Sequence, residues 1–232
     1  MNEAAPLAPL IAIIGADGSG KSTLAADLAA DMARDRPTAH VYLGLGSGPL
    51  GQRIAAWPVI GPLLGRVIGK KADRTRDPKE RIPGPFTALV VYWFSTRRKA
   101  RFDAMMALRR QGVLVITDRY PQIEVPGFDD GPGLSAARAE GAVVRWLAAR
   151  EARLYAAMAA HRPTLVLRLN IDADTALARK PDHGRALVEQ KVAITPQLTF
   201  GGAPIAEIDA TMDYAAEVAL ARRLIDQAIM TV

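Results

Sequence analysis

The strongest constraint on this chain is the segment Gly15–Ser22, GADGSGKS, which fits the pattern G-x-x-x-x-G-K-[ST]. Loops of this pattern turn backbone N–H groups toward the phosphates of a nucleoside triphosphate. The flanks fit as well, because the apolar run Leu10–Ile14 precedes the segment and a helical pattern over Thr23–Met32 follows it. The alternative, an accidental glycine-rich turn, does not require these flanks. The sequence therefore predicts triphosphate binding.

Each residue type in the loop has a physical purpose. Glycine lets the backbone turn tightly and approach a ligand without a Cβ in the way. We expect Lys21 to contact the β- and γ-phosphates of ATP and the Ser22 hydroxyl to bind Mg²⁺. The predicted nucleotide-binding residues of the loop are Gly15, Asp17, Gly18, Ser19, Gly20, Lys21, Ser22 and Thr23.

Composition narrows the classes of protein and partner. The 232 residues include no cysteine, which excludes disulfides and thiolate metal sites. Residues 1–9 lack the features of a signal peptide, and no apolar run approaches the roughly 18 residues that span a bilayer, so we expect a cytoplasmic protein. The net charge of +6 favours anionic partners. The basic run 66–81 is interleaved with acidic residues and lacks aromatic residues, which predicts a solvated segment and no nucleic-acid site.

Strand-like and helix-like segments alternate along the chain, which predicts a parallel α/β sheet of about five strands with helices on both faces. We expect a single domain over residues 1–232, with an atypical insertion at about 44–85 that contains a weak apolar helix over Ile54–Ile68. Beyond the first strand and helix, the predicted strands are His40–Leu43, Val113–Thr117, Leu165–Leu169 and Ile205–Ile208, and the predicted helices are Ala88–Arg110, Ser135–His161 and Met212–Met230.

A second set of polar residues, Asp118-Arg119-Tyr120, directly follows the third strand. Ligands of a parallel α/β sheet bind at the carboxyl ends of its strands, so Asp118 is expected to face the phosphate loop. There its carboxylate would hold Mg²⁺ directly or through water, although a carboxylate after a strand is often only a turn residue. Arg119 can clamp a phosphate or a carboxylate with two hydrogen bonds.

Three arginines in the helix before that strand, Arg97, Arg98 and Arg101, fall within or beside its apolar arc. One interpretation is that their charged ends reach solvent at the edge of the core. The other is that one or more of them binds an anionic second substrate, and Arg97 is the first candidate.

These motifs together resemble the thymidylate kinase-like branch of the nucleoside-monophosphate kinases, which belong to the P-loop NTPases. Residues 15–23 resemble the phosphate loop of that family, including its acidic residue, and Asp118-Arg119-Tyr120 matches its D-R-Y motif. Arg97 and Gly112 fall at matching spacings. The segment Arg162–Asp172 and the following Ala176–Lys180 are similar to the family's fourth strand and the start of its lid.

The resemblance implies a role for each matched position. Asp17 would contact a sugar hydroxyl of the acceptor, Arg97 and Arg119 would bind its phosphate, and Arg179 with Arg185 would close a lid, at about 179–200, over ATP. Two departures concern the acceptor side. The segment 44–85 shows no counterpart of the family's acceptor-binding segment, and residues 121–130 replace the small-residue run that follows D-R-Y.

The leading hypothesis is therefore an ATP- and Mg²⁺-dependent phosphotransferase acting on a small anionic acceptor, with Lys21, Asp17, Arg119 and Arg97 as its catalytic residues. A kinase for a sugar or another hydroxyl-bearing metabolite is the alternative, with Asp17 or Glu124 accepting the hydroxyl proton. A third hypothesis is an ATP-hydrolysing switch protein, and loss of catalysis with retained binding stays open. The oligomeric state is open too, with a homodimer among the options.

Overall fold

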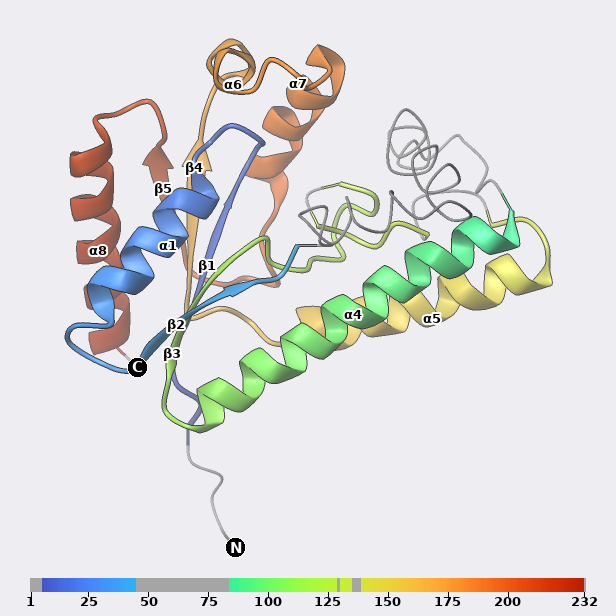
Figure 1. The fold of residues 1–232 in the computed structure, drawn as a ribbon, viewed down its shortest axis with the longest axis horizontal. Coiled ribbons are helices and arrows are strands. Elements are labelled where there is room, and N and C mark those ends of the chain that lie inside the picture. Colours follow the sequence, from blue (N-terminus) through green and yellow to red (C-terminus); the bar gives the residue numbers. More distant parts are fainter. Residues whose placement is uncertain (1–5, 45–83, 129, 135–138, 232) are drawn as a thin grey trace, which may run out of the picture. The chain divides into compact units, whose positions relative to one another are not determined.

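The computed structural model describes residues 6–44, 84–128, 130–134 and 139–231 (Figure 1). The chain divides into two compact units. The first comprises residues 1–43, 101–120 and 161–232, and the second comprises residues 44–100 and 121–160. The predicted insertion at about 44–85 and its apolar helix lie almost entirely outside the described residues. The expectation of one domain over 1–232 stays a prediction.

The first unit is built on a five-stranded parallel sheet with the strand order β2-β3-β1-β4-β5. The central position of β1 makes its carboxyl end a neighbour of two other strand ends, because Ile13 pairs with Asp118 of β3 and Gly15 pairs with Leu169 of β4. Ligand sites of parallel sheets form at the carboxyl ends of neighbouring strands. The strands are β1 Leu10–Gly15, β2 Thr38–Tyr42, β3 Leu114–Asp118, β4 Leu165–Asn170 and β5 Ile205–Asp209.

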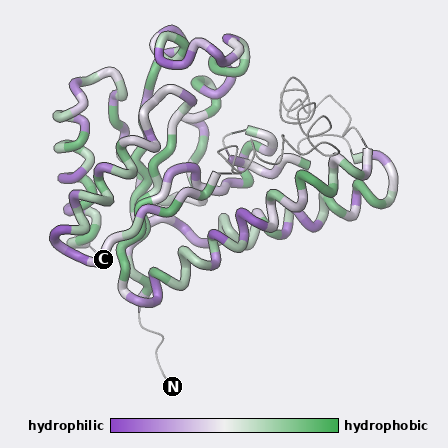
Figure 2. Tube along the Cα trace, viewed as in Figure 1, coloured by the Kyte–Doolittle hydropathy of each residue, from purple (hydrophilic) through white to green (hydrophobic). Residues whose placement is uncertain are grey.

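Helices cover both faces of this sheet, as the sequence predicts. Figure 1 shows α1 and α8 against one face and α7 on the other, and in Figure 2 the strands between them carry much apolar colouring. The core packs Leu24 and Leu28 of α1 and Ile225 of α8 together with apolar residues of the strands, so burial of side chains from distant segments holds the helices to the sheet. The helices of the first unit are α1 Lys21–Met32, α6 Ala173–Arg179, α7 Arg185–Ile194, the short 3₁₀ helix η1 Thr195–Gln197 and α8 Tyr214–Met230.

The second unit is a pair of helices joined to an ordered loop. It contains the first part of α4 Pro85–Arg110, whose last turns belong to the first unit, together with α5 Ala142–Ala159. The predicted helix Ser135–His161 is too long, because residues 139–141 are not helical and Gly141, with a φ of 82°, directly precedes α5. Apolar residues of α4 and α5 pack together with Leu134 of the loop.

Buried polar side chains connect that loop to both helices of the second unit. Arg98 is 0% exposed, and its guanidinium donates hydrogen bonds to the Tyr155 hydroxyl at 3.0 Å and to the carboxylate of Asp130. The Glu151 carboxylate accepts hydrogen bonds from the Ser95 hydroxyl and from the backbone N–H of Leu134, both at 2.6 Å. Arg98 therefore neither reaches solvent nor offers its charge to a substrate, and of the two sequence-based interpretations neither applies to it.

None of the helices within the described residues combines the length and the apolar character that a bilayer crossing requires.

The buried Arg98 leads to a prediction about the stability of the second unit. Arg98→Met should lower its free energy of unfolding by about 3 kcal/mol, because it leaves the Asp130 carboxylate without its buried cation. Urea unfolding followed by tryptophan fluorescence measures this unit, since both described tryptophans, Trp93 and Trp146, lie on α4 and α5. Arg145→Met removes an exposed arginine from α5 and should cost less than about 0.5 kcal/mol. Equal costs for the two variants would contradict the structural role of Arg98.

Candidate active site at the phosphate loop

The loop between β1 and α1 has the geometry that its sequence predicts. Gly18 and Gly20 have φ values of 90° and 87°, and a Cβ on Gly18 would lie 2.7 Å from the Ala176 carbonyl oxygen. Glycine is therefore required for the turn and for the close approach of α6. Gly20 directly precedes α1, so the loop ends at a helix N-terminus, where unpaired backbone N–H groups favour an anion. The Ser19 hydroxyl is buried without a hydrogen-bond partner among the described residues.

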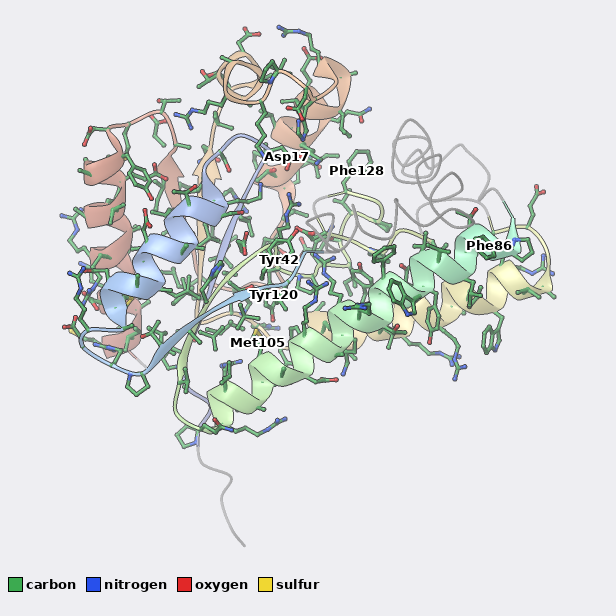
Figure 3. All side chains as sticks on the ribbon, in the orientation of Figure 1. Asp17, Tyr42, Phe86, Met105, Tyr120 and Phe128 are labelled. Carbon is green, nitrogen blue, oxygen red and sulfur yellow. The ribbon has the colours of Figure 1, made fainter. Side chains whose placement is uncertain are left out.

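Asp17, labelled in Figure 3, lies on the phosphate loop and its carboxylate is surrounded by cationic side chains. It is 7% exposed, and one of its carboxylate oxygens lies 3.1 Å from Arg119 Nη2 and 3.6 Å from Lys21 Nζ. The other oxygen accepts a hydrogen bond from the ammonium of Lys191 on α7 and lies 3.9 Å from His183 Nε2. Burial by itself raises the pKa of Asp17, but Lys191 and then Lys21 outweigh it and hold the pKa far below its ordinary value. The carboxylate is therefore ionised at neutral pH and a poor proton acceptor.

A second polar pair joins the start of α1 to the end of β3. The Ser22 hydroxyl donates a hydrogen bond to Asp118 Oδ2 at 2.5 Å, and His40 Nε2 on β2 lies 3.1 Å from Asp118 Oδ1. Burial raises the pKa of Asp118, but the hydrogen bonds from His40 and Ser22 lower it below its ordinary value. The structure thus brings together the two residues that the sequence predicts as metal ligands.

The predicted lid region consists of the end of α6, all of α7 and η1. Arg179 donates hydrogen bonds to the carbonyl oxygens of Gly18, at 3.3 Å, and Ala210, at 2.9 Å, so it contacts the phosphate loop through the backbone. Arg185 forms exposed ion pairs with Asp174, at 2.8 Å, and Glu189, at 3.4 Å. Of the two lid arginines that the resemblance implies, Arg179 therefore reaches the loop, whereas Arg185 is paired on the surface.

Arg119 and Tyr120, which directly follow β3, are held by contacts within the first unit. Arg119 has a φ of 65°, a left-handed conformation that is uncommon outside glycine and often marks functional sites. This turn places its guanidinium against Asp17. The Tyr120 hydroxyl donates a hydrogen bond to the His161 carbonyl, and its ring packs near Phe102 and Phe200, which indicates a structural role.

Arg97 belongs to the second unit, where its guanidinium lies 4.9 Å from the centre of the Trp93 ring. Arg101 is on the first-unit part of α4, and its guanidinium lies 5.8 Å from the centre of the Tyr42 ring. An acceptor-binding role for Arg97 stays a prediction.

The sequence analysis does not predict three residues that the structure places at the site, namely His40, His183 and Lys191. Lys191 carries a local signal, because Val188, Lys191, Val192 and Thr195 have the spacing of one helix face. A lysine within such a face indicates a buried charge with a partner. The two histidines have no comparable signal, since their contacts join positions 78 and 166 residues apart.

A cavity of about 460 Å³ lies within the first unit beside the loop. It extends from Ala16 over the carboxyl ends of β4 and β5 to α7 and η1, and its polar lining includes Asn170, Asp172, Asp209 and Thr211. Mixed apolar and hydrogen-bonding walls of this kind are typical of sites for small molecules.

The ion cluster predicts a pH-dependent contribution of Asp17 to stability. Asp17→Asn should lower the free energy of unfolding by about 3 kcal/mol at pH 7, because buried Lys191 and Lys21 lose their counter-charge. The folded-state pKa is depressed, so this contribution is present above about pH 4, the ordinary value of an aspartate, and lost as the pH falls toward the folded value. Urea unfolding followed by circular dichroism between pH 7 and pH 3 measures the difference. Asp174→Asn, at an exposed pair, is the control; an equal loss in both variants would argue against the cluster.

Comparison with known proteins places the chain in a family. No protein-family model matches it. A protein of Escherichia coli strain K12, "Uncharacterized ATP-binding protein YghS", is 49% identical over 201 residues, which are 86% of this chain and 85% of that protein. In the same strain, "Uncharacterized ATP-binding protein YghR" is 42% identical over 206 residues, 88% of this chain and 82% of that protein. With its phosphate loop on a five-stranded parallel sheet, the chain has the P-loop NTPase fold and belongs to the family of YghS and YghR.

Proposed function

We propose that this protein binds ATP with Mg²⁺ and transfers the γ-phosphate to a small anionic acceptor. One observation carries the proposal: cations from three separate elements meet at the carboxylate of the phosphate loop. Lys21 comes from the start of α1, Arg119 from the turn after β3 and Lys191 from α7. Phosphoryl transfer depends mainly on positioning and on neutralising charge around the transferred group, so such a cluster is suited to it. The relatives YghS and YghR are both named as ATP-binding proteins, which supports ATP as the nucleotide.

The residues of the loop fit a triphosphate. The turn at Gly18 and Gly20 and the N-terminus of α1 provide backbone N–H groups, and the buried Ser19 hydroxyl has unused hydrogen-bonding capacity. Lys21 donates a hydrogen bond to the Ala16 carbonyl at 3.1 Å, which keeps its ammonium folded over the loop. Arg179 and the cavity beside Ala16 are the proposed contacts for the rest of the nucleotide.

The donor atoms of Ser22 and Asp118 also fit Mg²⁺. A hydroxyl and a carboxylate 2.5 Å apart offer the hard oxygen ligands that this cation prefers. Among the described residues no group of three or more histidine, aspartate and glutamate side chains could hold a metal ion. Ser22 and Asp118 would therefore hold Mg²⁺ together with nucleotide phosphates and water, and the cation would help to neutralise the transferred phosphoryl group.

Two observations bear on the acceptor. A phosphate acceptor has a second pKa near 6 and is already ionised at neutral pH, so it needs no general base. A sugar hydroxyl does need one, and the strongly depressed pKa of Asp17 makes that carboxylate unsuited to the task. Glu124, on the loop after Tyr120, is the remaining candidate base. These considerations support an anionic acceptor with Arg119 as its proposed ligand, and the acceptor-binding role of Arg97 stays a prediction.

Coupled assays over a panel of nucleoside monophosphates, phosphorylated sugars and neutral sugars test this choice. Transfer to phosphorylated acceptors alone supports the proposal. Transfer to neutral sugars, with loss of activity in Glu124→Gln, favours the alternative kinase. ATP hydrolysis stimulated by a partner, with no phosphorylated product, favours a switch protein.

Lys21→Ala should weaken ATP binding about 100-fold, because charge-assisted hydrogen bonds to phosphate contribute roughly 1.5–3 kcal/mol. Isothermal titration calorimetry in Mg²⁺ measures the affinity, and circular dichroism checks that the fold is retained. Arg223→Ala, at an exposed position on α8, should bind ATP like the unaltered protein. Unchanged affinity in Lys21→Ala would refute the proposed nucleotide site.

Asp118→Asn should reduce the benefit of Mg²⁺ for ATP binding about 10-fold, since an amide is a weaker ligand than a carboxylate for this cation. Calorimetry with Mg²⁺ and with EDTA separates this effect from nucleotide binding itself. The affinity in EDTA should change less than about threefold. An equal loss under both conditions would assign Asp118 to the architecture of the loop rather than to the metal.

A further inference from the structure

Lys191 occupies a position where a lysine is costly. Val188, Lys191, Val192 and Thr195 share one face of α7 and its continuation, and Lys191 is 8% exposed on that face. An apolar side chain there would avoid the desolvation penalty of a buried ammonium, and replacing buried ion pairs with apolar residues is often neutral or stabilising. Stability alone therefore does not account for this lysine.

Packing fixes where the Lys191 ammonium lies. Val188, one turn earlier, is part of the main core of the first unit, which anchors α7 against the sheet. The Thr195 hydroxyl donates a hydrogen bond to the Lys191 carbonyl at 2.8 Å, which stabilises the last turn of the helix. The ammonium consequently stays beside the phosphate loop instead of sampling solvent.

The partner of Lys191 gives its location a chemical meaning. Lys191 binds one oxygen of Asp17, and Lys21 lies 3.6 Å from the other oxygen. Lys21 is the lysine that the loop motif directs at the phosphates, so the two ammonium groups serve one small region. The arginines of the lid are engaged differently, because Arg179 binds backbone carbonyls and Arg185 pairs on the surface.

From this geometry we infer that Lys191 is a further catalytic residue, which contacts the γ-phosphate of bound ATP. Asp17 is then a positioning residue: its carboxylate holds the Lys191 ammonium at the loop until the more highly charged phosphate takes its place. The inference rests on the proposed function. It assigns to α7 the cation that the family resemblance places at Arg179 or Arg185.

The role of Lys191 in the reaction follows from charge. The acceptor oxygen forms a bond to the γ-phosphorus as the bond to the β,γ-bridging oxygen breaks, and the electron pair of that bond leaves with ADP. Lys191 donates hydrogen bonds to the γ-phosphate oxygens and keeps its protons throughout. Because a donor of this kind acts on charge spread over the transferred group, its loss should lower kcat more than ATP affinity.

The decisive experiment compares two nucleotides that differ in the γ-phosphate. Isothermal titration calorimetry in Mg²⁺ measures binding of the β,γ-imido analogue of ATP and of ADP to the unaltered protein, Lys191→Met, Lys191→Arg and the control Arg223→Ala, which alters an exposed position on α8. Lys191→Met should bind the analogue about 10-fold more weakly and bind ADP within about twofold of the unaltered protein. In transfer assays with ATP and an acceptor, the kcat of Lys191→Met should be about 100-fold lower than that of the unaltered protein. Lys191→Arg should retain most of the analogue affinity and of kcat, and Arg223→Ala should change neither.

Each other outcome is informative. An equal loss for both nucleotides, or no loss, overturns the role of Lys191 while ATP binding by the unaltered protein keeps the proposed function standing. If the unaltered protein binds neither nucleotide, the proposed function fails and the inference fails with it. Should Lys191→Met not fold, the double variant Asp17→Asn/Lys191→Met removes both charges of the pair. It must lose the same preference for the analogue over ADP, and retention of that preference overturns the inference.

Discussion

The site depends on the ion pairs that the buried carboxylate of Asp17 makes with three cationic side chains. It lies on the phosphate loop and receives cations from α1, from the turn after β3 and from α7. Three cations brought close together repel one another, and burial strengthens the repulsion. One ionised carboxylate among them offsets part of that repulsion, so the loop, β3 and α7 keep their mutual positions. A carboxylate held in this way is a poor base, whereas contact with a sugar hydroxyl of the acceptor, the role that the family resemblance implies for Asp17, stays a prediction.

The site has two groups of polar side chains, one around Asp17 and one formed by Ser22 and Asp118, which differ in charge and in position. The Asp17 centre gathers positive charge at the loop, whereas the pair of Ser22 and Asp118 offers oxygen ligands at the start of α1. His40 contacts the Asp118 oxygen that Ser22 does not use, so the carboxylate is held from both sides. Parallel pairing with β1 and β2 aligns the end of β3 with the loop, which explains how residues about 100 positions apart form one site.

Local patterns account for most of what the sequence predicts correctly. The strands and long helices follow from hydrophobic periodicity, and the loop follows from glycines that the turn requires within eight residues. The helix predicted over Ser135–His161 is too long because alanine and arginine favour helix on both sides of Gly141, and only the backbone shows that the helix begins after that glycine. Long-range pairing is the harder part. Arg98 has the sequence context of a substrate-binding arginine, yet its partners Asp130 and Tyr155 lie 32 and 57 residues away. Nothing local to Asp17 indicates that its main partner is Lys191, 174 residues further along the chain.

In the second unit, buried polar side chains order the loop after Tyr120 by hydrogen bonding to its backbone. Gln122 is 1% exposed, and its amide exchanges hydrogen bonds with the backbone at Val125 and Phe128. Gly131 permits this arrangement, because a Cβ there would lie 2.6 Å from the Gln122 amide nitrogen. With Glu151 binding the backbone near Leu134, buried polar groups fix a loop that has few apolar residues of its own. In the first unit a buried carboxylate gathers cations at the phosphate loop, whereas in the second unit a buried amide and a buried carboxylate bind the backbone. This order comes from hydrogen bonds between buried side chains and the backbone of the loop itself, which a search for local hydrophobic periodicity in the sequence does not detect.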